Sequence, residues 1–351
     1  MRKFTKGNDA VVIGALYAGC DVYFGYPITP ASEIAEGAAE LFPQLGKEYL
    51  QAECETASIN MLYGAASGGK LAMTASSGPG ISLMQEGISY MAGAQLPALI
   101  VNIMRAGPGL GNIGPEQGDY NQAVKGGGHG NYHAIVLAPA SVQEMCDLTI
   151  KAFELAFKYR NPAMILADAT LGQVKESLKL PEKESEKPDT TTWSVQGDAK
   201  TRRNLISSIY LDLELMEKHN EMLQAKYASM EKEAMSETYL IEDAELIITG
   251  YGTSARVARS AVDQLRKEGV KAGLFRPISL MPFPTRELNR VMLGKKVLVA
   301  EMSNGQYRDD VLLHLEREVR TPVRLVNRMG GILIQVEDVL KAARRMMKEV
   351  Q

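Results

Sequence analysis

The chain has 351 residues, of which 45% are hydrophobic and 23% are charged, so it is long enough for two domains of ordinary globular composition. The formal net charge of -3 excludes a general electrostatic attraction to nucleic acid or to anionic lipid. No apolar run is long enough to cross a bilayer and the first residues lack the pattern of an export signal, so we expect a cytoplasmic protein.

The first half of the chain is predicted to form a wound, mainly parallel α/β sheet. Helical patterns alternate with short apolar runs between position 11 and about position 170. Several of these runs are apolar on both faces, which is typical of buried parallel strands. The predicted strands are 21–26, 71–76, 98–104, 134–138 and 163–168.

A polar linker and one long helix are predicted between the two halves. The segment 202–235 contains no Gly or Pro, and its apolar residues recur at helical spacing. These residues are Leu205, Ile209, Leu213, Met216, Leu223, Tyr227 and Met230. The pattern fits a brace between domains and a surface that packs on another subunit equally well.

A second α/β alternation follows, with predicted strands at 246–250, 273–276, 296–300 and 323–327 and a terminal amphipathic packing helix at 337–350. The run Gly250 to Ser254 formally matches a dinucleotide fingerprint, but the next strand ends in Arg276 instead of an acidic residue. We interpret the run as a structural turn or an anion site. The predicted domains are 1–175, 176–243 (the linker and helix) and 244–351.

The segment 51–80 carries the strongest local pattern, QAECETASINMLYGAASGGKLAMTASSGPG. A glutamate opens a helix of small residues, a strand follows, and a serine-glycine turn starts the next helix. Its glycines place bare peptide at the strand ends, where open α/β sheets bind ligands. The arrangement resembles the pyrimidine-binding domain of thiamine-diphosphate enzymes.

That resemblance implies that Glu55 hydrogen-bonds the aminopyrimidine ring and favours the tautomer that activates the cofactor. It also implies a cofactor-lining turn, made of Ser77, Gly78, Pro79 and Gly80. Glu53 is expected to point elsewhere, because residues two apart on a helix do not share a face. Without the surrounding pattern, Glu55 would be read as a first-turn acid facing the helix dipole.

The run GYPITP at 25–30 resembles the YPITP motif of 2-oxoacid:ferredoxin oxidoreductases. By that resemblance Thr29 contacts the substrate carboxylate or the adjacent cofactor; it also suits the N-cap of a helix beginning near Ala31. Arg105 follows an apolar strand, and the matching arginine of this family binds the 2-oxoacid carboxylate, a planar group that suits a guanidinium. Outside the resemblance, Arg105 would be an ordinary salt-bridge partner. The second domain resembles the transketolase C-terminal domain.

The loop after Arg105, AGPGLGNIGPEQGDY, resembles that of the branched-chain (2-oxoisovalerate) members more than that of the 2-oxoglutarate members, whose loop is richer in Ser and Thr. Leu110 and Ile113 either present apolar surface to an isopropyl group or pack the loop on its own domain. His129 and His133 have a spacing that would suit a metal on a helix, but their neighbouring glycines predict a loop without metal.

Two parts of such an enzyme have no match in this sequence. The acidic Gly-Asp-Gly segment that holds a magnesium-bound diphosphate is absent, since neither 118–120 nor 197–199 continues correctly. Cys20, Cys54 and Cys146 are far apart, which argues against a disulfide framework, structural zinc or an iron–sulfur cluster, and each is read as a small buried hydrophobe. The resemblance therefore implies a beta subunit with the diphosphate and Mg²⁺ site, and clusters on beta or on a ferredoxin-like gamma chain.

The expected function is that of the alpha subunit of a 2-oxoacid:ferredoxin oxidoreductase. With coenzyme A it would oxidatively decarboxylate 2-oxoisovalerate to acyl-CoA, CO₂ and reduced ferredoxin, sharing thiamine diphosphate with the beta subunit. The same reaction on 2-oxoglutarate is the alternative, and a non-catalytic scaffold subunit is a remote third. A self-contained thiamine-diphosphate decarboxylase would need the diphosphate domain in the same chain.

Overall fold

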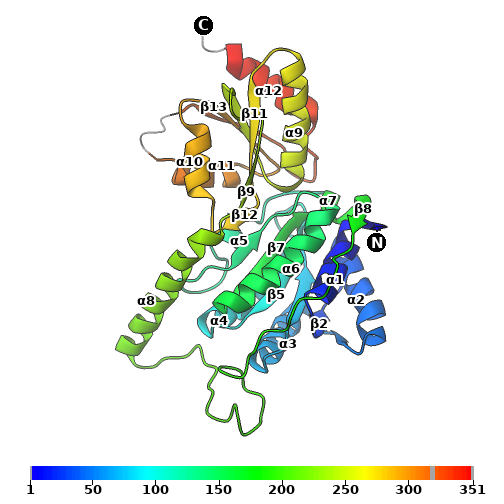
Figure 1. Cartoon of the computed structure of the whole chain (residues 1–351), viewed down its shortest axis with the longest axis vertical. Coiled ribbons are helices and arrows are strands. Elements are labelled where there is room, and N and C mark those ends of the chain that lie inside the picture. Colours follow the sequence, from blue (N-terminus) through cyan, green and yellow to red (C-terminus); the bar gives the residue numbers. More distant parts are fainter. Residues whose placement is uncertain (1, 317–320, 349–351) are drawn as a thin grey trace.

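A computed structural model describes residues 2–316 and 321–348. The described chain forms two α/β units stacked along the long axis of the molecule (Figure 1). The first unit is built on a seven-stranded sheet, the second on a five-stranded sheet. The predicted α/β class with two wound, mainly parallel sheets is therefore confirmed.

The first sheet has the order β12-β6-β7-β5-β4-β2-β3, and every pair is parallel except β12 with β6. The five predicted strands of this half are confirmed, and every residue of β4 to β7 is buried, as their apolar sequences require. The strands are β2 Val22–Gly25, β3 Glu48–Gln51, β4 Ala72–Ser76, β5 Ala98–Met104, β6 Ile135–Leu137, β7 Pro162–Asp168 and β12 Ser279–Met281.

Helices cover both faces of the first sheet. On one side α1 packs against α2 and α6, and on the other α3 packs against α4. Short helices α5 and α7 follow β5 and β7. The helices are α1 Gly7–Tyr17, α2 Ser32–Gln44, α3 Glu55–Ser67, α4 Pro79–Gly93, α5 Tyr120–Val124, α6 Val142–Tyr159 and α7 Ala169–Gln173.

The second sheet has the order β14-β13-β10-β11-β9 and is parallel except for β9. All four strands predicted here are confirmed. Helix α9 packs with α12, and α10 with α11; the predicted terminal helix begins at Val336, and positions 349–350 lie outside the described residues. The elements are β9 Ser236–Tyr239, β10 Leu246–Thr249, α9 Gly252–Lys267, β11 Ala272–Pro277, α10 Thr285–Met292, β13 Lys296–Glu301, α11 Gln306–His314, β14 Val323–Asn327 and α12 Val336–Lys348.

Strands are exchanged across the predicted domain limits. β9 belongs to the predicted linker but joins the second sheet, and β12 belongs to the predicted third segment but completes the first sheet. A separate two-stranded ribbon pairs β1 Arg2–Lys6 with β8 Lys175–Lys179. The predicted boundaries 175/176 and 243/244 therefore do not separate the two sheets, since each sheet takes a strand from across a boundary.

The prediction of one helix over 202–235 is wrong in its first third. The helix α8 spans Leu213–Ser229 and continues as a 3₁₀ turn, Met230–Glu233. Asp212 starts it, because its side chain accepts a hydrogen bond from the Leu215 N–H at 2.9 Å. Upstream, the Ser207 hydroxyl accepts from the Ile209 N–H at 3.1 Å, a local bond that competes with helix formation.

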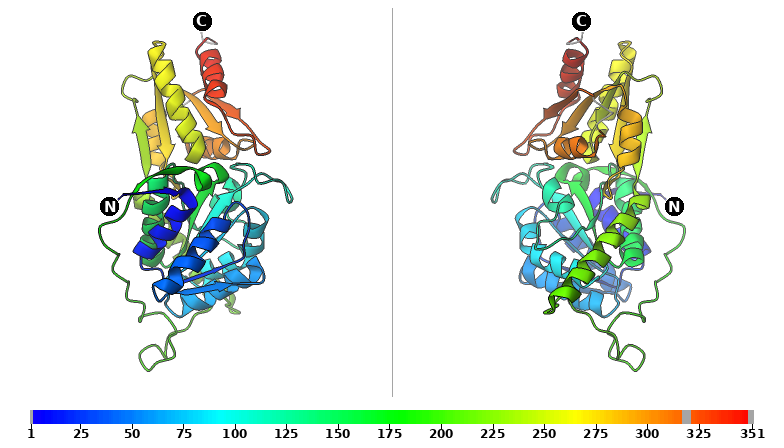
Figure 2. Two further views of the ribbon diagram at one scale, coloured as in Figure 1. Left: turned by 90° about the vertical axis from the view of Figure 1, so that its right-hand side faces the viewer. Right: turned by 90° about the vertical axis from the view of Figure 1, so that its left-hand side faces the viewer.

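Helix α8 lies obliquely across the first unit (Figure 2). His219 Nε2 lies 2.7 Å from the Gly93 carbonyl, and Gln224 donates to the Asn131 carbonyl at 3.0 Å. Of the predicted apolar stripe, Leu223, Tyr227 and Met230 are buried and Leu205, Ile209 and Leu213 are exposed. The second half of the stripe thus packs within the chain and the first half does not. None of the described helices is both long and apolar enough to cross a membrane.

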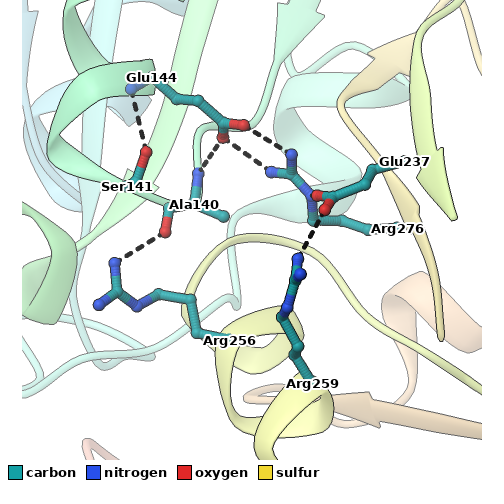
Figure 3. Close-up of polar contacts among 7 residues, drawn as sticks. All are labelled: Ala140, Ser141, Glu144, Glu237, Arg256, Arg259 and Arg276. Carbon is teal, nitrogen blue, oxygen red and sulfur yellow. Dashed lines mark hydrogen bonds and ion pairs between the residues drawn. The ribbon is translucent and has the colours of Figure 1, made fainter. Parts of the chain in front are cut away.

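Buried Arg276 joins the two units through ion pairs (Figure 3). Both terminal nitrogens of Arg276, in β11, donate to the Glu144 carboxylate on α6, at 2.8 and 2.6 Å. Its Nε donates to Glu237 of β9 at 2.9 Å, and Glu237 also accepts from Arg259. Arg276 is 3% exposed, and a buried guanidinium persists only with such paired carboxylates. These ion pairs help to hold the two units in their relative orientation.

Candidate functional site

The carboxyl ends of the strands in the two sheets face one another. Asp168 ends β7, and its carboxylate accepts a hydrogen bond at 2.8 Å from the hydroxyl of Thr253, which follows β10. Gln117, in the loop after β5, accepts from the Met302 N–H at 2.9 Å, just past the end of β13. Ligands of open α/β sheets bind at these ends, so this junction is the place to look for a site.

The turn from Ser77 to Gly80 lies at this edge, between β4 and α4. Gly78 is the N-cap of α4 with φ +45° and ψ -111°, a conformation that favours glycine. Pro79 then takes the first position of the helix, where its missing N–H is no loss. The predicted cofactor-lining residues therefore form one tight turn, in which Ser77 and Gly80 are buried and Gly78 and Pro79 are partly exposed.

Glu55 reaches this turn from α3. It is the first residue of that helix and is 5% exposed, whereas Glu53 is exposed. A Cβ atom on Gly80 would lie 2.4 Å from Glu55 Oε1 and 2.2 Å from the Ser76 hydroxyl, so the carboxyl lies directly against the glycine. No described residue donates a hydrogen bond to that carboxyl, and its oxygens are not among the fully buried polar atoms that lack a partner, so they remain open to a ligand.

Arg105 lies on the other flank of the same turn. Its Nη1 donates to the Thr29 carbonyl and its Nη2 to the Leu110 carbonyl, each at 3.0 Å. A Cβ on Gly78 would be 3.4 Å from Arg105 Cγ, and the buried Nε has no partner among the described residues. The guanidinium is thus held in place by two carbonyls while part of its donor capacity is unused.

Thr29 contributes its backbone to this arrangement, and its side chain is exposed. The alternative that Thr29 caps the following helix is wrong, because Ala31 is the N-cap of α2 and no side chain caps that end. The predicted residues Thr29, Glu55, Arg105 and the turn are therefore brought together at one strand edge.

A cavity of about 910 Å³ opens beside Arg105 between the two units. Its first-unit lining includes the turn residues Gly78 and Pro79 and the loop after β5. Its second-unit lining follows the ends of β13 and β14, and these residues were not predicted: Ser303, Asn304, Gln306, Met329 and Gly330. The signal that would have found them is their place at the carboxyl ends of parallel strands.

With 80% and 62% exposure, Leu110 and Ile113 are not packed on their own domain, so that interpretation is wrong. They do not line the cavity of this chain, and their contact with a substrate side chain stays a prediction. What the Arg105 loop does hold toward the cavity is acidic. Asp119 accepts from the Asn102 amide at 3.0 Å, and burial raises the pKa of its carboxyl.

Glu116 fastens the Arg105 loop to the second unit. One carboxylate oxygen accepts from the Gly107 N–H at 2.8 Å, and the other accepts from the Gly330 N–H at 2.9 Å. The Asn112 amide also donates to the Gly330 carbonyl at 3.1 Å. The width of the cavity mouth is therefore set by bonds between the two units.

The run Gly250 to Ser254 is a structural turn, and the negative group at this turn is the carboxylate of Asp168 in the same chain. The Asp168 carboxylate also accepts from the Thr253 N–H at 3.4 Å at the start of α9, and burial raises the pKa of this carboxyl. Ser254 donates to Gln117 at 2.7 Å. The positive end of α9 is thus already satisfied by an internal carboxylate.

The histidines and cysteines show no metal-site geometry. His129 and His133 lie in the loop between α5 and β6, as the glycines predicted. Cys20 and Cys146 are buried, and half-buried Cys54 is the N-cap of α3. Among residues 2–316 and 321–348, no group of three or more His, Cys, Asp and Glu side chains could hold a metal ion.

The polar groups around the turn fit the aminopyrimidine end of thiamine diphosphate. The buried hydroxyls of Ser76 and Ser77 have no partner in the described chain, and the Glu55 carboxyl lies beside them. A ring carrying N–H groups and nitrogen acceptors would satisfy such atoms. The metal-bound diphosphate end finds no matching acidic cluster among these residues.

Two family models match consecutive parts of the chain. Residues 13–243 match "Pyruvate flavodoxin/ferredoxin oxidoreductase, thiamine diP-bdg". Residues 244–339 match "Pyruvate:ferredoxin oxidoreductase core domain II". Together they cover both units.

Named relatives match over nearly their whole length. The ketoisovalerate oxidoreductase subunit VorB of Methanothermobacter marburgensis is 57% identical over 99% of this chain and 98% of its own. The 2-oxoglutarate synthase subunit KorA of Archaeoglobus fulgidus is 40% identical over 94% and 95%. The solved 2-oxoglutarate:ferredoxin oxidoreductase from Magnetococcus marinus, with 2-oxoglutarate, coenzyme A and succinyl-CoA bound, matches all of this chain with a TM-score of 0.87 and 27% identity; this chain spans 65% of that longer one.

Proposed function

The chain belongs to the pyruvate flavodoxin/ferredoxin oxidoreductase family, and we propose that it is the alpha subunit of an enzyme that oxidatively decarboxylates 2-oxoisovalerate. The reaction consumes coenzyme A and oxidised ferredoxin and yields acyl-CoA, CO₂ and reduced ferredoxin. The observation that carries the proposal is the packing of Glu55 and Arg105 on the two flanks of one glycine turn. The similarity to a ketoisovalerate oxidoreductase subunit over 99% of the chain supports the substrate.

Glu55 is the catalytic residue of this chain. Its carboxyl would accept a hydrogen bond from the N–H of the aminopyrimidine ring, and Ser77, Gly78, Pro79 and Gly80 would line that side of the cofactor. Thiamine diphosphate, when bound, supplies the electron sink that decarboxylation of a 2-oxoacid needs. Burial of Glu55 keeps water from competing for its oxygens.

Arg105 and Thr29 bind the substrate. The guanidinium is already oriented by the Thr29 and Leu110 carbonyls, so little side-chain entropy is lost when it pairs with the substrate carboxylate. Its remaining terminal N–H groups can donate to that carboxylate. Thr29, whose side chain is exposed, is proposed as an additional donor.

Partner chains complete the enzyme. A beta subunit carries the diphosphate and Mg²⁺ half of the cofactor site, and iron–sulfur clusters lie on beta or on a ferredoxin-like gamma chain that passes electrons to ferredoxin. The names of the relatives, subunit VorB and subunit KorA, support a multi-subunit assembly. The cytoplasmic location stays a prediction.

The same reaction on 2-oxoglutarate is the second candidate, and the 40% identity to a 2-oxoglutarate synthase subunit favours it. A non-catalytic scaffold is a remote third, because the unpartnered Glu55 carboxyl and Arg105 Nε would then have no use. Neither alternative explains the acidic lining of the cavity as well as a monocarboxylic substrate does.

The test is reduction of ferredoxin or a viologen by this chain co-expressed with its partner subunits. We expect coenzyme A-dependent activity with 2-oxoisovalerate that exceeds the activity with 2-oxoglutarate and pyruvate. Higher activity with 2-oxoglutarate would keep the family and replace the substrate. A complete complex that is inactive with every 2-oxoacid would favour the scaffold.

A further inference from the structure

The second unit places one large apolar side chain on the cavity wall. Met329 follows the end of β14 and is the largest apolar residue among those that line the cavity; the others are Ala106 and two prolines. It is about half exposed, at 52%, so part of its side chain is available for contact. A thioether side chain is flexible and adapts to small branched groups.

The position of Met329 is fixed by its neighbours. Gly330 is bonded on both sides of its peptide, through its N–H to Glu116 and through its carbonyl to Asn112. A Cβ on Gly114 would lie 2.7 Å from Gly331 Cα, so the two loops touch along their backbones. Met329 and Arg105 therefore line the same cavity, at the place where the two units meet.

The charges of the cavity distinguish between substrates. Among the described residues that line it, Arg105 is the only cation, and Glu116 and Asp119 are the carboxylic acids. Once Arg105 holds the first carboxylate, a second carboxylate on the substrate would find Glu116 and Asp119 but no further cation among the described lining residues of this subunit. A desolvated anion without a partner is strongly disfavoured, whereas an aliphatic group in the same place costs little.

We infer that Met329 contacts the aliphatic side chain of the 2-oxoacid and is a specificity-determining residue of this subunit. The inference rests on the proposed function, because it takes the Arg105 guanidinium as the anchor for the common carboxylate. It assigns the selection of a branched side chain to the second unit, and it replaces Leu110 and Ile113, which do not line the cavity.

The experiment compares kcat/KM for 2-oxoisovalerate, 2-oxoglutarate and pyruvate in the reconstituted complex. We expect Met329→Ala to lower kcat/KM for 2-oxoisovalerate roughly tenfold and to change the value for pyruvate little, since pyruvate has only a methyl group to place. Met329→Lys supplies the missing cation and raises the ratio of 2-oxoglutarate to 2-oxoisovalerate by roughly tenfold or more. Met329→Leu keeps the wild-type order.

Ile332→Ala is the matched control, because Ile332 belongs to the same loop, is 60% exposed and does not line the cavity. Its substrate ratios stay at wild-type values. Assembly of each variant is checked by size-exclusion chromatography. If Met329→Ala does not assemble, Met329→Gln, which keeps the size of the side chain, takes its place as the test. We expect its kcat/KM for 2-oxoisovalerate to fall relative to that for pyruvate.

Unchanged ratios in the Met329 variants, or an equal loss for all three acids, would overturn the inference and leave the proposed function standing. The same shift in Ile332→Ala would also overturn it. A wild-type complex that is inactive with all three acids would overturn the proposed function and this inference together.

Discussion

Glu55 and Gly80 are so close that one extra carbon atom would collide with the carboxylate. The Cβ of any other residue at position 80 would lie 2.4 Å from Glu55 Oε1, and the Ser76 hydroxyl closes the other side. Because Glu55 is buried, its carboxyl has little room to move away. Only glycine at position 80 therefore leaves room for the carboxyl in its present place.

Gly80→Ala is therefore expected to displace Glu55 and to lower kcat of the reconstituted complex by roughly tenfold or more. It should also lower the free energy of unfolding by about 1 to 3 kcal/mol through overpacking. Gly64→Ala is the control, since a Cβ there meets nothing within 4 Å on an exposed helix position. That variant should be slightly stabilised, and equal effects of the two changes would contradict the role of Gly80.

Glu55→Gln should lower kcat by roughly 100-fold or more, because an amide is a far weaker acceptor for the ring N–H than a carboxylate. Glu53→Gln is the matched control and should leave kcat unchanged, since Glu53 is exposed two residues away. Steady-state viologen reduction by the reconstituted complex measures both. Normal turnover by Glu55→Gln would remove the catalytic role and favour the scaffold.

Arg276→Gln should lower the free energy of unfolding by about 2 kcal/mol or more, because Glu144 and Glu237 would each lose a charged partner. Both carboxylates are partly exposed, so the loss should fall short of that for a fully buried pair. Urea unfolding measures the change. The exposed pair of Arg290 with Glu287 is the comparison, and Arg290→Gln should alter stability by no more than about 0.5 kcal/mol.

Lys226 should make the fold more stable as the pH rises. Its amino group donates to the Arg160 carbonyl, and burial together with the Arg160 charge lowers its pKa to about 7. Between this value and the ordinary pKa of lysine, the unfolded chain binds a proton that the folded chain does not, so the free energy of unfolding increases with pH across that window.

The difference in unfolding free energy between wild type and Lys226→Met, measured in urea at pH 7 and at pH 9.5, isolates this group. The free energy of unfolding of the wild type should rise relative to that of Lys226→Met at the higher pH. Lys218→Met, at an exposed position of the same helix, should show no such pH-dependent difference. A constant difference for Lys226→Met would mean that the amino group titrates normally in the fold.

The sequence predicted nine strands because each is a short run rich in apolar residues, and all of them except the edge strand β14 are largely buried. It did not predict β3, β9 or β12, which are short or partly exposed edge strands whose pairing depends on distant partners. A helix at 202–212 was predicted from helical spacing of apolar residues and from the absence of Gly and Pro. There, local hydrogen bonds of Ser207 and the N-cap Asp212 prevail.

For the site, the strand and turn pattern predicted which edge of the sheet to inspect, because the ends of parallel strands converge there. The choice of Glu55 and Arg105 at that edge came from the resemblance to the family. The second-unit wall with Asn304 and Met329 was missed. Those residues reach the cavity because contacts such as Arg276 with Glu144 and Glu116 with Gly330 join segments far apart in sequence. Their place at the carboxyl ends of strands was readable, but the facing of the two sheets was not.

The strand β12 completes the first sheet although it is synthesised much later than the other strands of that sheet. Until residues 279–281 leave the ribosome, β6 presents an unpaired edge at the rim of an otherwise complete sheet. A chain that stops before β12 would leave this edge of the sheet unpaired, so the three residues 279–281 make the first sheet depend on a segment that follows it by more than a hundred residues.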